Sequence, residues 1–299
     1  MKAILLMAGM WLGAPGQPAV DPGSYVQQEE SWRRERQARL KADGGWLTVA
    51  GLFWLKPGAN SFGADPGNDV VLPGHAAPAR AGRFVLEGGH VRVEVRPGAG
   101  VTRAGRPVTR ADLRSDADGA APDVLALGPL TMQVIARGAR LGVRLKDRES
   151  AARRDFKGTR WFPIRTEYRV LARFVARAAP EKIGVPTVLG TVEPMPSPGT
   201  LTFQLGGKTM SLDPVVEPGE RELFVIFRDA TSGRTTYGGG RFLYADPPRD
   251  GHDDVVLDFN RAYSPPCAFT RYATCPLPPS QNHLHVAIEA GELDPEQGR

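Results

Sequence analysis

The alternation of apolar and polar positions predicts one helix followed by many short strands. Between Ser24 and Lys41 an acidic residue precedes a basic one by four positions at Glu29/Arg33, Glu30/Arg34 and Glu35/Arg39. This spacing and orientation stabilise a helix, and Ser24 is a suitable N-cap residue. The segment has few apolar residues, so we expect a structural helix that lies on the surface of the body.

From Gly45 onward the pattern changes to strands. His90 to Val95 alternates between valine and polar residues, which is typical of a strand with one buried face. Gly88-Gly89 before it predicts a tight hairpin with the strand at residues 83–86. Gly206-Gly207 predicts another hairpin between residues 200–205 and 209–212, and Arg137-Gly138 joins residues 130–136 to 141–145. Further strands are predicted at residues 46–49, 52–55, 69–72, 130–136, 141–145, 168–175, 200–205, 209–212, 223–228, 241–244 and 255–259. Such spacing indicates an all-β protein, built as sandwich-like or barrel-like modules.

A polar, irregular stretch at residues 146–162 divides these strands into two groups. A chain of 299 residues suits two modules, and its 35 glycines and 27 prolines are spread along it as turns between short strands require. We therefore expect two packed antiparallel β modules with a short N-terminal helix. The predicted division is a signal peptide at 1–19, a helix and linker at 20–44, and β modules at 45–150 and 156–293.

The first residues have the layout of a secretory signal. One lysine precedes an apolar run from Ala3 to Leu12, and small and turn-forming residues follow as far as Ala19. A buried N-terminal helix is the alternative. The run is shorter than the roughly 20 apolar residues that span a bilayer, and no other segment is long enough. We expect a periplasmic or secreted protein without stable membrane insertion.

Charge and missing motifs exclude several functions. The formal net charge is only +5, and the arginines of residues 169–173 alternate with apolar residues as on a solvated sheet face. No basic patch of the kind that binds nucleic acid is present, so no nucleic-acid partner is expected. The chain also lacks a Gly-x-Ser-x-Gly elbow, a His-Glu-x-x-His helix and a Cys-x-x-Cys pair. The common serine hydrolase, zincin and redox signatures are therefore absent.

Cys267 and Cys275 are the only cysteines. In an oxidising compartment the simplest prediction is a disulfide between them. A thiolate site, nucleophilic or metal-binding, is the alternative. His283 and His285 would project from one face of a strand and could join a thiolate around zinc, or they could be two surface histidines.

Two stretches of the chain resemble a known family. They run from Trp46 to Leu72 and from Phe224 to Glu292. Gly45-Trp46-Leu47 with Gly51-Leu52-Phe53-Trp54-Leu55 carry the first, and a set of motifs from Asp229 onward carries the second. The second set includes Thr236-Tyr237-Gly238-Gly239-Gly240-Arg241-Phe242-Leu243, Asp258-Phe259-Asn260-Arg261-Ala262-Tyr263, Pro265-Pro266-Cys267-Ala268-Phe269 and Cys275-Pro276-Leu277-Pro278-Pro279. On these residues the chain resembles the family named domain of unknown function 1684. The resemblance implies where a site lies but implies no activity, cofactor or metal.

Residues 60–72 and the hairpins that follow also resemble a forkhead-associated sandwich, a fold that reads phosphothreonine. That fold has an arginine after its first glycine and a Ser-x-x-His loop. Here Ala64 follows Gly63, and Leu72 stands three residues before His75. A sandwich of this shape is compatible with the sequence, whereas its phosphopeptide function lacks the residues it requires.

The candidate site residues are polar side chains at strand ends in the C-terminal module. Arg241 presents a fork of donors suited to a carboxylate or phosphate ligand, or to an internal ion pair with Asp229 or Asp258. Asp258 and Asn260 could instead make turn hydrogen bonds to the backbone. The predicted ligand-binding residues are Asp229, Tyr237, Arg241, Asp258, Asn260, Tyr263 and Asn282.

From these residues we predict that the protein binds a small polar or anionic molecule in a C-terminal pocket. One alternative is a hydrolase that uses Cys267 or a metal held by cysteine and histidine. Another is a structural envelope protein in which the same residues only stabilise the fold. The sequence implies no cofactor and indicates no oligomeric state.

Overall fold

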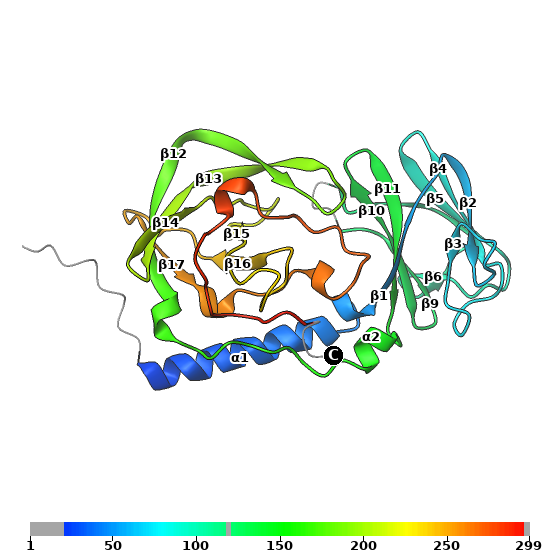
Figure 1. The fold of residues 1–299 in the computed structure, drawn as a ribbon. Coiled ribbons are helices and arrows are strands. Elements are labelled where there is room, and N and C mark those ends of the chain that lie inside the picture. The colour runs from blue at the N-terminus through cyan, green and yellow to red at the C-terminus, as the bar shows by residue number, and fades with distance from the viewer. Residues whose placement is uncertain (1–20, 118–120, 296–299) are drawn as a thin grey trace, which may run out of the picture.

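The computed structural model describes residues 21–117 and 121–295 and consists mainly of antiparallel sheets. An N-terminal β module and a C-terminal β body lie side by side, and helix α1 (Pro22–Lys41) runs along the C-terminal body to their junction (Figure 1). The predicted all-β class with an N-terminal helix is confirmed. The predicted signal peptide lies outside the described residues.

The N-terminal module consists of two sheets that enclose one apolar core. One has the strand order β1-β11-β10-β9-β6-β7 and the other β3-β2-β4-β5-β8. Phe62 and Phe84 from the second sheet belong to the same buried cluster as Leu130 and Met132 from the first. The strands are β1 Val49–Trp54, β2 Gly58–Gly63, β3 Val70–Val71, β4 Gly82–Glu87, β5 His90–Val95, β6 Thr102–Arg103, β7 Arg106–Pro107, β8 Arg110–Leu113, β9 Val124–Leu127, β10 Leu130–Arg137 and β11 Arg140–Asp147.

The predicted hairpins of this module are confirmed. Glu87 pairs with His90 across Gly88-Gly89, and both glycines have the positive φ angles that such a tight turn requires. β10 and β11 pair through a turn at residues 138–139, as expected. The short helix α2 (Ala151–Arg154) follows β11.

The C-terminal body combines a four-stranded sheet, β14-β13-β12-β17, with the two-stranded sheet β15-β16. Its strands are β12 Arg169–Pro186, β13 Val192–Leu205, β14 Lys208–Leu212, β15 Leu223–Phe227, β16 Arg241–Ala245 and β17 Asp254–Asp258. The strand predicted at residues 168–175 forms, although β12 continues to Pro186 as a long ribbon with β13. Apolar side chains of both sheets, including Phe203, Phe227 and Leu257, build its core.

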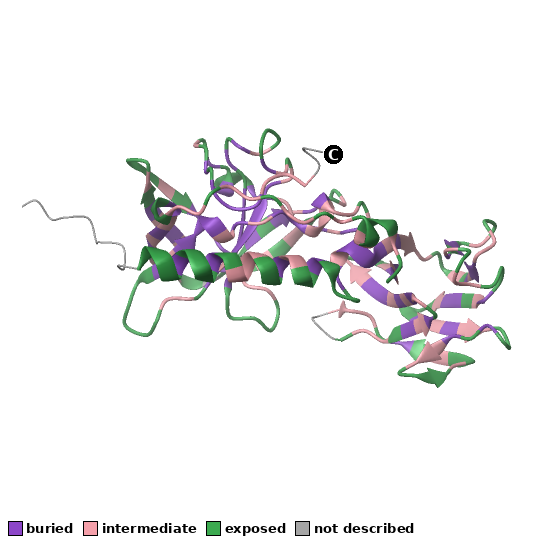
Figure 2. Cartoon of the chain, turned by 90° about the horizontal axis from the view of Figure 1, so that it is seen from below, coloured by how far each residue is buried: buried purple, intermediate pink, exposed green. Residues whose placement is uncertain are grey.

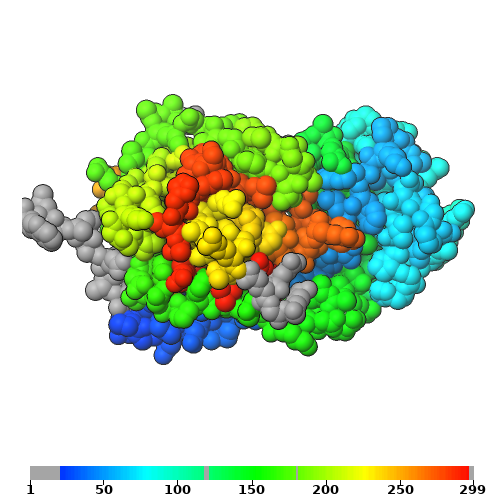
Figure 3. All heavy atoms as spheres, viewed as in Figure 1, coloured from blue at the N-terminus to red at the C-terminus, as the bar shows by residue number. Residues whose placement is uncertain are grey.

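The segment after β17 pairs with the two-stranded sheet at two places, through Tyr263 with Phe242 of β16 and through residues 282–284 with Arg228 just after β15. It contains three single-turn 3-10 helices, η4 Phe259–Arg261, η5 Pro266–Ala268 and η6 Ser280–Asn282, and a further one, η3 Thr166–Tyr168, precedes β12. Residues 282–284 bond the backbone of Arg228 at the end of β15. In the space-filling view this segment surrounds the loop that connects β15 and β16 (Figure 3).

Two strand predictions are wrong. Residues 46–48 form the 3-10 turn η1 (Trp46–Thr48), because the Thr48 hydroxyl and amide both bond the carbonyl of Gly45. His283 and His285 do not lie on a strand, since the chain leaves η6 as irregular backbone fixed by the bonds to Arg228. Their predicted projection from one strand face is therefore lost.

Helix α1 is held to the C-terminal body by polar side chains. Its cap is Asp21, whose carboxylate accepts from the Ser24 amide at 2.8 Å, so the predicted Ser24 cap is wrong. Glu29 is fully buried and bonds Arg261 instead of the predicted Arg33. The solvent-facing side of the helix is exposed, while Tyr25, Glu29, Arg36 and Leu40 are buried (Figure 2). The helix is thus an anchored element of the body, and this anchoring fixes the position of Arg36.

Across residues 21–117 and 121–295, no helix combines the length and apolar character needed to cross a membrane.

Candidate functional site

A cavity of ≈310 Å³ lies where α1, the N-terminal module and the C-terminal body meet. We call it the junction cavity. Its charged side chains are Arg36 of α1, Arg137 at the end of β10 and Glu217 of the β14–β15 connection. Its aromatic side chains are Trp46, Phe224, Phe242, Tyr244 and Tyr263. A small concave site with apolar walls and a few polar groups is the usual form of a ligand-binding site.

Strand geometry explains the aromatic wall. Phe242 and Tyr244 are two residues apart on β16 and therefore project from one face. Phe224 of β15 stacks on Tyr244 with ring centroids 4.7 Å apart and packs edge-on against Phe242. Tyr263 exchanges two backbone hydrogen bonds with Phe242, both 2.9 Å long, which brings its ring beside the same face.

Two arginines of the β10–β11 hairpin meet beside the cavity at Thr274. The Arg137 Nε donates to the Thr274 hydroxyl at 2.8 Å, and its Nη1 bonds Asp116. Arg144 is 5% exposed, and its Nη2 lies 3.4 Å from the same hydroxyl. No carboxylate in the described part of the chain lies within ion-pair distance of Arg144. Burial and the charge of Arg137 lower the pKa of Arg144 to about 10.

Arg144 instead stacks on an aromatic ring. Its guanidinium carbon lies 5.2 Å from the ring centre of Trp46, which lines the cavity. A cation over an indole face gains some stabilisation, but a neutral ring does not replace a counter-ion.

Arg36 connects the cavity to a buried carboxyl group. Its Nε lies 3.4 Å from Glu292, its Nη2 donates to the Ser264 carbonyl at 2.9 Å, and its guanidinium covers the ring of Tyr263. Glu292 is fully buried, and burial raises its pKa to about 7 although Arg36 opposes this shift. One buried acid therefore titrates close to neutral pH behind the cavity wall.

Glu217 is the acidic group of the cavity. The Tyr244 hydroxyl donates to its Oε2 at 2.6 Å. Burial, the neighbouring Tyr263 and this hydrogen bond raise the pKa of Tyr244. Within the described residues Glu217 has no ion-pair partner, and its Oε1 accepts no hydrogen bond.

The predicted disulfide is absent from the structure, where Cys267 and Cys275 are both free thiols. The Cys267 amide donates to the Cys275 sulfur at 3.2 Å, so this sulfur serves as a hydrogen-bond acceptor beside the cavity. Hydrogen bonding with Cys267 and burial raise the pKa of Cys275. A neutral thiol at this position is a poor nucleophile.

Arg241 and Asp229 lie together, but away from the junction cavity. Arg241 is fully buried and forms an ion pair with Asp229, and it also donates to the carbonyls of Ala290 and Ile288. Its side chain leaves β16 on the face opposite to Phe242 and Tyr244. Gly240 before it has φ 89°, and a Cβ there would lie 2.6 Å from the Phe227 carbonyl oxygen. This close packing explains the last glycine of the triplet.

The other predicted residues hold the fold together at separate places. Both oxygens of Asp258 accept from the Tyr25 hydroxyl, and Asn260 bonds this hydroxyl and the Arg165 backbone. Asn282 bonds the carbonyls of residues 213 and 226. Tyr237 hydrogen-bonds Cys267, and only Tyr263 of the predicted set lines the junction cavity. The ligand-binding role of the other six stays a prediction.

Sequence reasoning missed Arg36, Trp46, Arg137 and Glu217, which come from four separate segments. No local pattern unites them. The alternation along residues 241–245 was a usable signal, since it places Phe242 and Tyr244 on a common face that excludes Arg241.

The described residues contain no group of three or more histidine, cysteine, aspartate or glutamate side chains that could hold a metal ion. The His283 ring instead bonds the Pro278 carbonyl at 3.1 Å. The metal-based alternative therefore finds no ligand set in this part of the chain.

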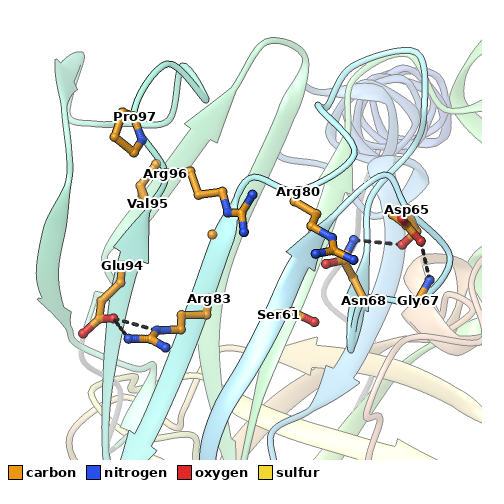
Figure 4. A pocket seen from close by; sticks show the side chains of 11 residues that line it. Ser61, Asp65, Gly67, Asn68, Arg80, Arg83, Glu94, Val95, Arg96 and Pro97 are labelled. Atoms are coloured by element: carbon orange, nitrogen blue, oxygen red, sulfur yellow. Dashed lines mark hydrogen bonds and ion pairs between the residues drawn. The ribbon is translucent and has the colours of Figure 1, made fainter.

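A second, open hollow of ≈550 Å³ lies on the N-terminal module (Figure 4). Three arginines reach it, and Arg83 is paired with Glu94 at 2.7 Å. Asp65 accepts from the Gly67 amide at 2.8 Å, which closes the adjoining loop. Arg80 and Arg96 remain without an ion pair among the described residues, as is common for exposed arginines.

These features define a mostly β protein in which an N-terminal helix and two β bodies surround a small aromatic cavity. The chain belongs to the DUF1684 family of proteins of unknown function, whose model matches residues 154–293. An uncharacterized protein of Haloarcula marismortui, solved by NMR, is 36% identical. That match covers 48% of this chain and 80% of the other, with a TM-score of 0.42.

Two forkhead-associated domains are similar to a smaller part of the chain. One was studied for phosphothreonine-dependent interactions, and the other is the FhaA FHA domain. Each is 20% identical, covers 32% of this chain and has a TM-score of 0.23, and the matches cover 92% and 97% of those domains. No curated protein matches the chain. None of these likenesses assigns an activity to it.

Proposed function

We propose that this protein binds a small anionic molecule in the junction cavity. The observation that carries the proposal is a buried arginine, Arg144, with no carboxylate at ion-pair distance among the described residues. Next to it stands a second arginine, Arg137, whose Nη2 makes no hydrogen bond within the same residues. A buried positive charge without a counter-ion is costly, and a bound anion would supply that counter-ion.

The electrostatics of the cavity support an anion. The pKa of Arg144 falls to about 10 because burial and Arg137 both disfavour a positive charge there. A carboxylate or phosphate group near these guanidinium groups would reverse that effect. Arg36, which also lines the cavity, adds a third donor fork, although Glu292 already occupies its Nε.

The aromatic wall supports a ligand with a flat or apolar part. Five aromatic side chains line a cavity of only ≈310 Å³. Rings favour offset or edge-on contacts with another ring, and such contacts add to the gain from burial. A small aromatic or apolar carboxylate satisfies both the wall and the arginines.

The proposal is tested by calorimetric titration with benzoate, phenylacetate, 3-phenylpropanoate and phenyl phosphate. We expect at least one to bind, and Arg137→Ala to weaken its binding by about tenfold or more, as for the loss of a charge-assisted hydrogen bond. Arg140→Ala is the matched control, because Arg140 faces Arg137 across the hairpin but stacks on Trp54. Failure of all four probes to bind, or equal affinity in both variants, would contradict the proposal.

A further inference from the structure

A third hollow, also of ≈550 Å³ and here called the vestibule, adjoins the junction cavity. Arg137 and Glu217 line both spaces and therefore stand at the boundary between them. The vestibule also presents Glu193 and Glu220, which are paired with no basic group among the described residues. Asp116 is there too, but its carboxylate bonds Arg137.

The charge of the vestibule is unfavourable for a simple anion. Glu193 and Glu220 carry negative charge without an ion pair among the described residues, and the positive charge of Arg137 is partly offset because Asp116 pairs with its Nη1. A hollow lined by one sign of charge raises the local concentration of the opposite sign. A molecule that enters by this route is therefore favoured when part of it is cationic.

Among the described residues Glu217, which lines the cavity, is an acid without an ion-pair partner, and Arg144, which contacts the lining residues Thr274 and Trp46, is a base without one. Among the described residues only the Tyr244 hydroxyl bonds the Glu217 side chain, at Oε2, and no basic side chain lies within ion-pair distance of it. The protein does not satisfy these opposite charges by pairing them with each other. A ligand would therefore stabilise the site by bringing a cationic group to Glu217 and an anionic group to the arginines.

The aromatic wall accommodates a cation next to Glu217. The ring of Tyr244 adjoins this carboxylate through the hydrogen bond and stacks on Phe224. The faces of aromatic rings attract ammonium groups, and this attraction grows when water is excluded.

From this arrangement we infer that the ligand is a zwitterion, a small amino acid with an apolar or aromatic side chain. Its ammonium group lies against Glu217 and its carboxylate against Arg137, which meets Arg144 at the Thr274 hydroxyl, with the side chain on the aromatic wall. This inference rests on the proposed function and names the class of ligand for the same cavity.

The test compares three probes that share one ring and chain length but differ in charge. They are L-phenylalanine, 3-phenylpropanoate and 2-phenylethylamine, each titrated into the full protein. L-phenylalanine is expected to bind about tenfold more tightly than either of the others, because only it pairs both charges.

Glu217→Gln assigns this preference to one residue. The glutamine keeps an oxygen that accepts from Tyr244, and it removes the charge. We expect the affinity for L-phenylalanine to fall about tenfold while that for 3-phenylpropanoate is unchanged. The matched control is Glu220→Gln, since Glu220 lines the vestibule but not the cavity. Thermal unfolding of both variants checks that they remain folded.

The other outcomes separate the two proposals. Equal binding of L-phenylalanine and 3-phenylpropanoate would overturn the zwitterion and leave anion binding intact. Binding of 2-phenylethylamine alone would overturn both. A folded Glu217→Gln variant that still prefers L-phenylalanine would overturn the role of Glu217.

Discussion

Arg241 and Arg144 are both buried arginines on β-strands, but their surroundings differ. Arg241 in the C-terminal body has a carboxylate partner, Asp229, and two carbonyl acceptors. Arg144 in the N-terminal module has one hydroxyl acceptor and an indole ring. The Nε atoms of both lack a hydrogen-bond partner, so the difference lies in the counter-ion. A buried charge with its own partners is part of the scaffold, and one without them indicates a binding site.

The comparison predicts that the Arg241 pair matters most for stability. Asp229→Ala leaves the Arg241 charge buried without its counter-ion and should lower the free energy of unfolding by about 3–5 kcal/mol. Urea denaturation followed by circular dichroism measures this change. The control is Glu30→Ala, which breaks the exposed pair with Arg34 and should change it by about 0–1 kcal/mol. A loss of stability no larger than in the control would contradict the conclusion that the Arg241–Asp229 pair stabilises the fold.

The sequence predicted those parts of the fold that depend on local pattern. The alternation of residues 90–95 and the glycine pairs at 88–89 and 206–207 determine strands and turns within a few residues, and these predictions are confirmed. The strand predicted at residues 46–49 was wrong at its start, because the Thr48 hydroxyl bonds the Gly45 carbonyl and the apolar run forms a 3-10 turn.

The candidate site could not be predicted in the same way. Arg36, Arg137 and Glu217 meet only because α1 is anchored to the body and the two bodies pack together. The anchoring depends on the buried pair of Glu29 and Arg261, residues 232 positions apart. The ligand-binding residues were predicted from polar motifs such as the one around Arg241, but the Arg241 side chain bonds other residues of the protein instead.

Glu292 lies close to both Arg36 and Arg241, and the positive charges of these arginines oppose the rise in its pKa. Burial raises its pKa in the folded protein from 4.5 to about 7. Between these pH values the folded state retains a proton that the unfolded state has lost. Its contribution to stability is therefore fully present below about pH 4.5 and is lost as the pH rises through 7.

Glu292→Gln removes this titration, and we expect the variant to lose less stability than the wild type between pH 5 and pH 8. The difference should approach roughly 3 kcal/mol, from about 1.4 kcal/mol for each unit of pKa shift. Urea denaturation at several pH values measures it. Glu289→Gln is the control, because Glu289 is exposed and its ion pair with Arg165 is long, at 3.9 Å. Parallel pH profiles for the wild type and Glu292→Gln would show that this carboxyl is not the titrating group.

Of the substitutions at Asp229, Glu292 and Arg144, we expect Arg144→Met to change the free energy of unfolding least. Unlike Asp229→Ala, which lowers this free energy, it should leave it unchanged or raise it. Methionine is a shorter, flexible apolar side chain that can pack under Trp46, and it removes a buried charge that has no ion-pair partner among the described residues. Replacing such a charge with a well-packed apolar side chain is often neutral or stabilising, so the free energy of unfolding should stay within about 1 kcal/mol or rise. The same variant should bind the carboxylate probes more weakly, as measured by calorimetric titration.

A destabilisation as large as that of Asp229→Ala would mean that Arg144 also serves only to stabilise the fold. A stable variant that loses the ligand would instead show that the protein retains an unfavourable charge because the ligand requires it.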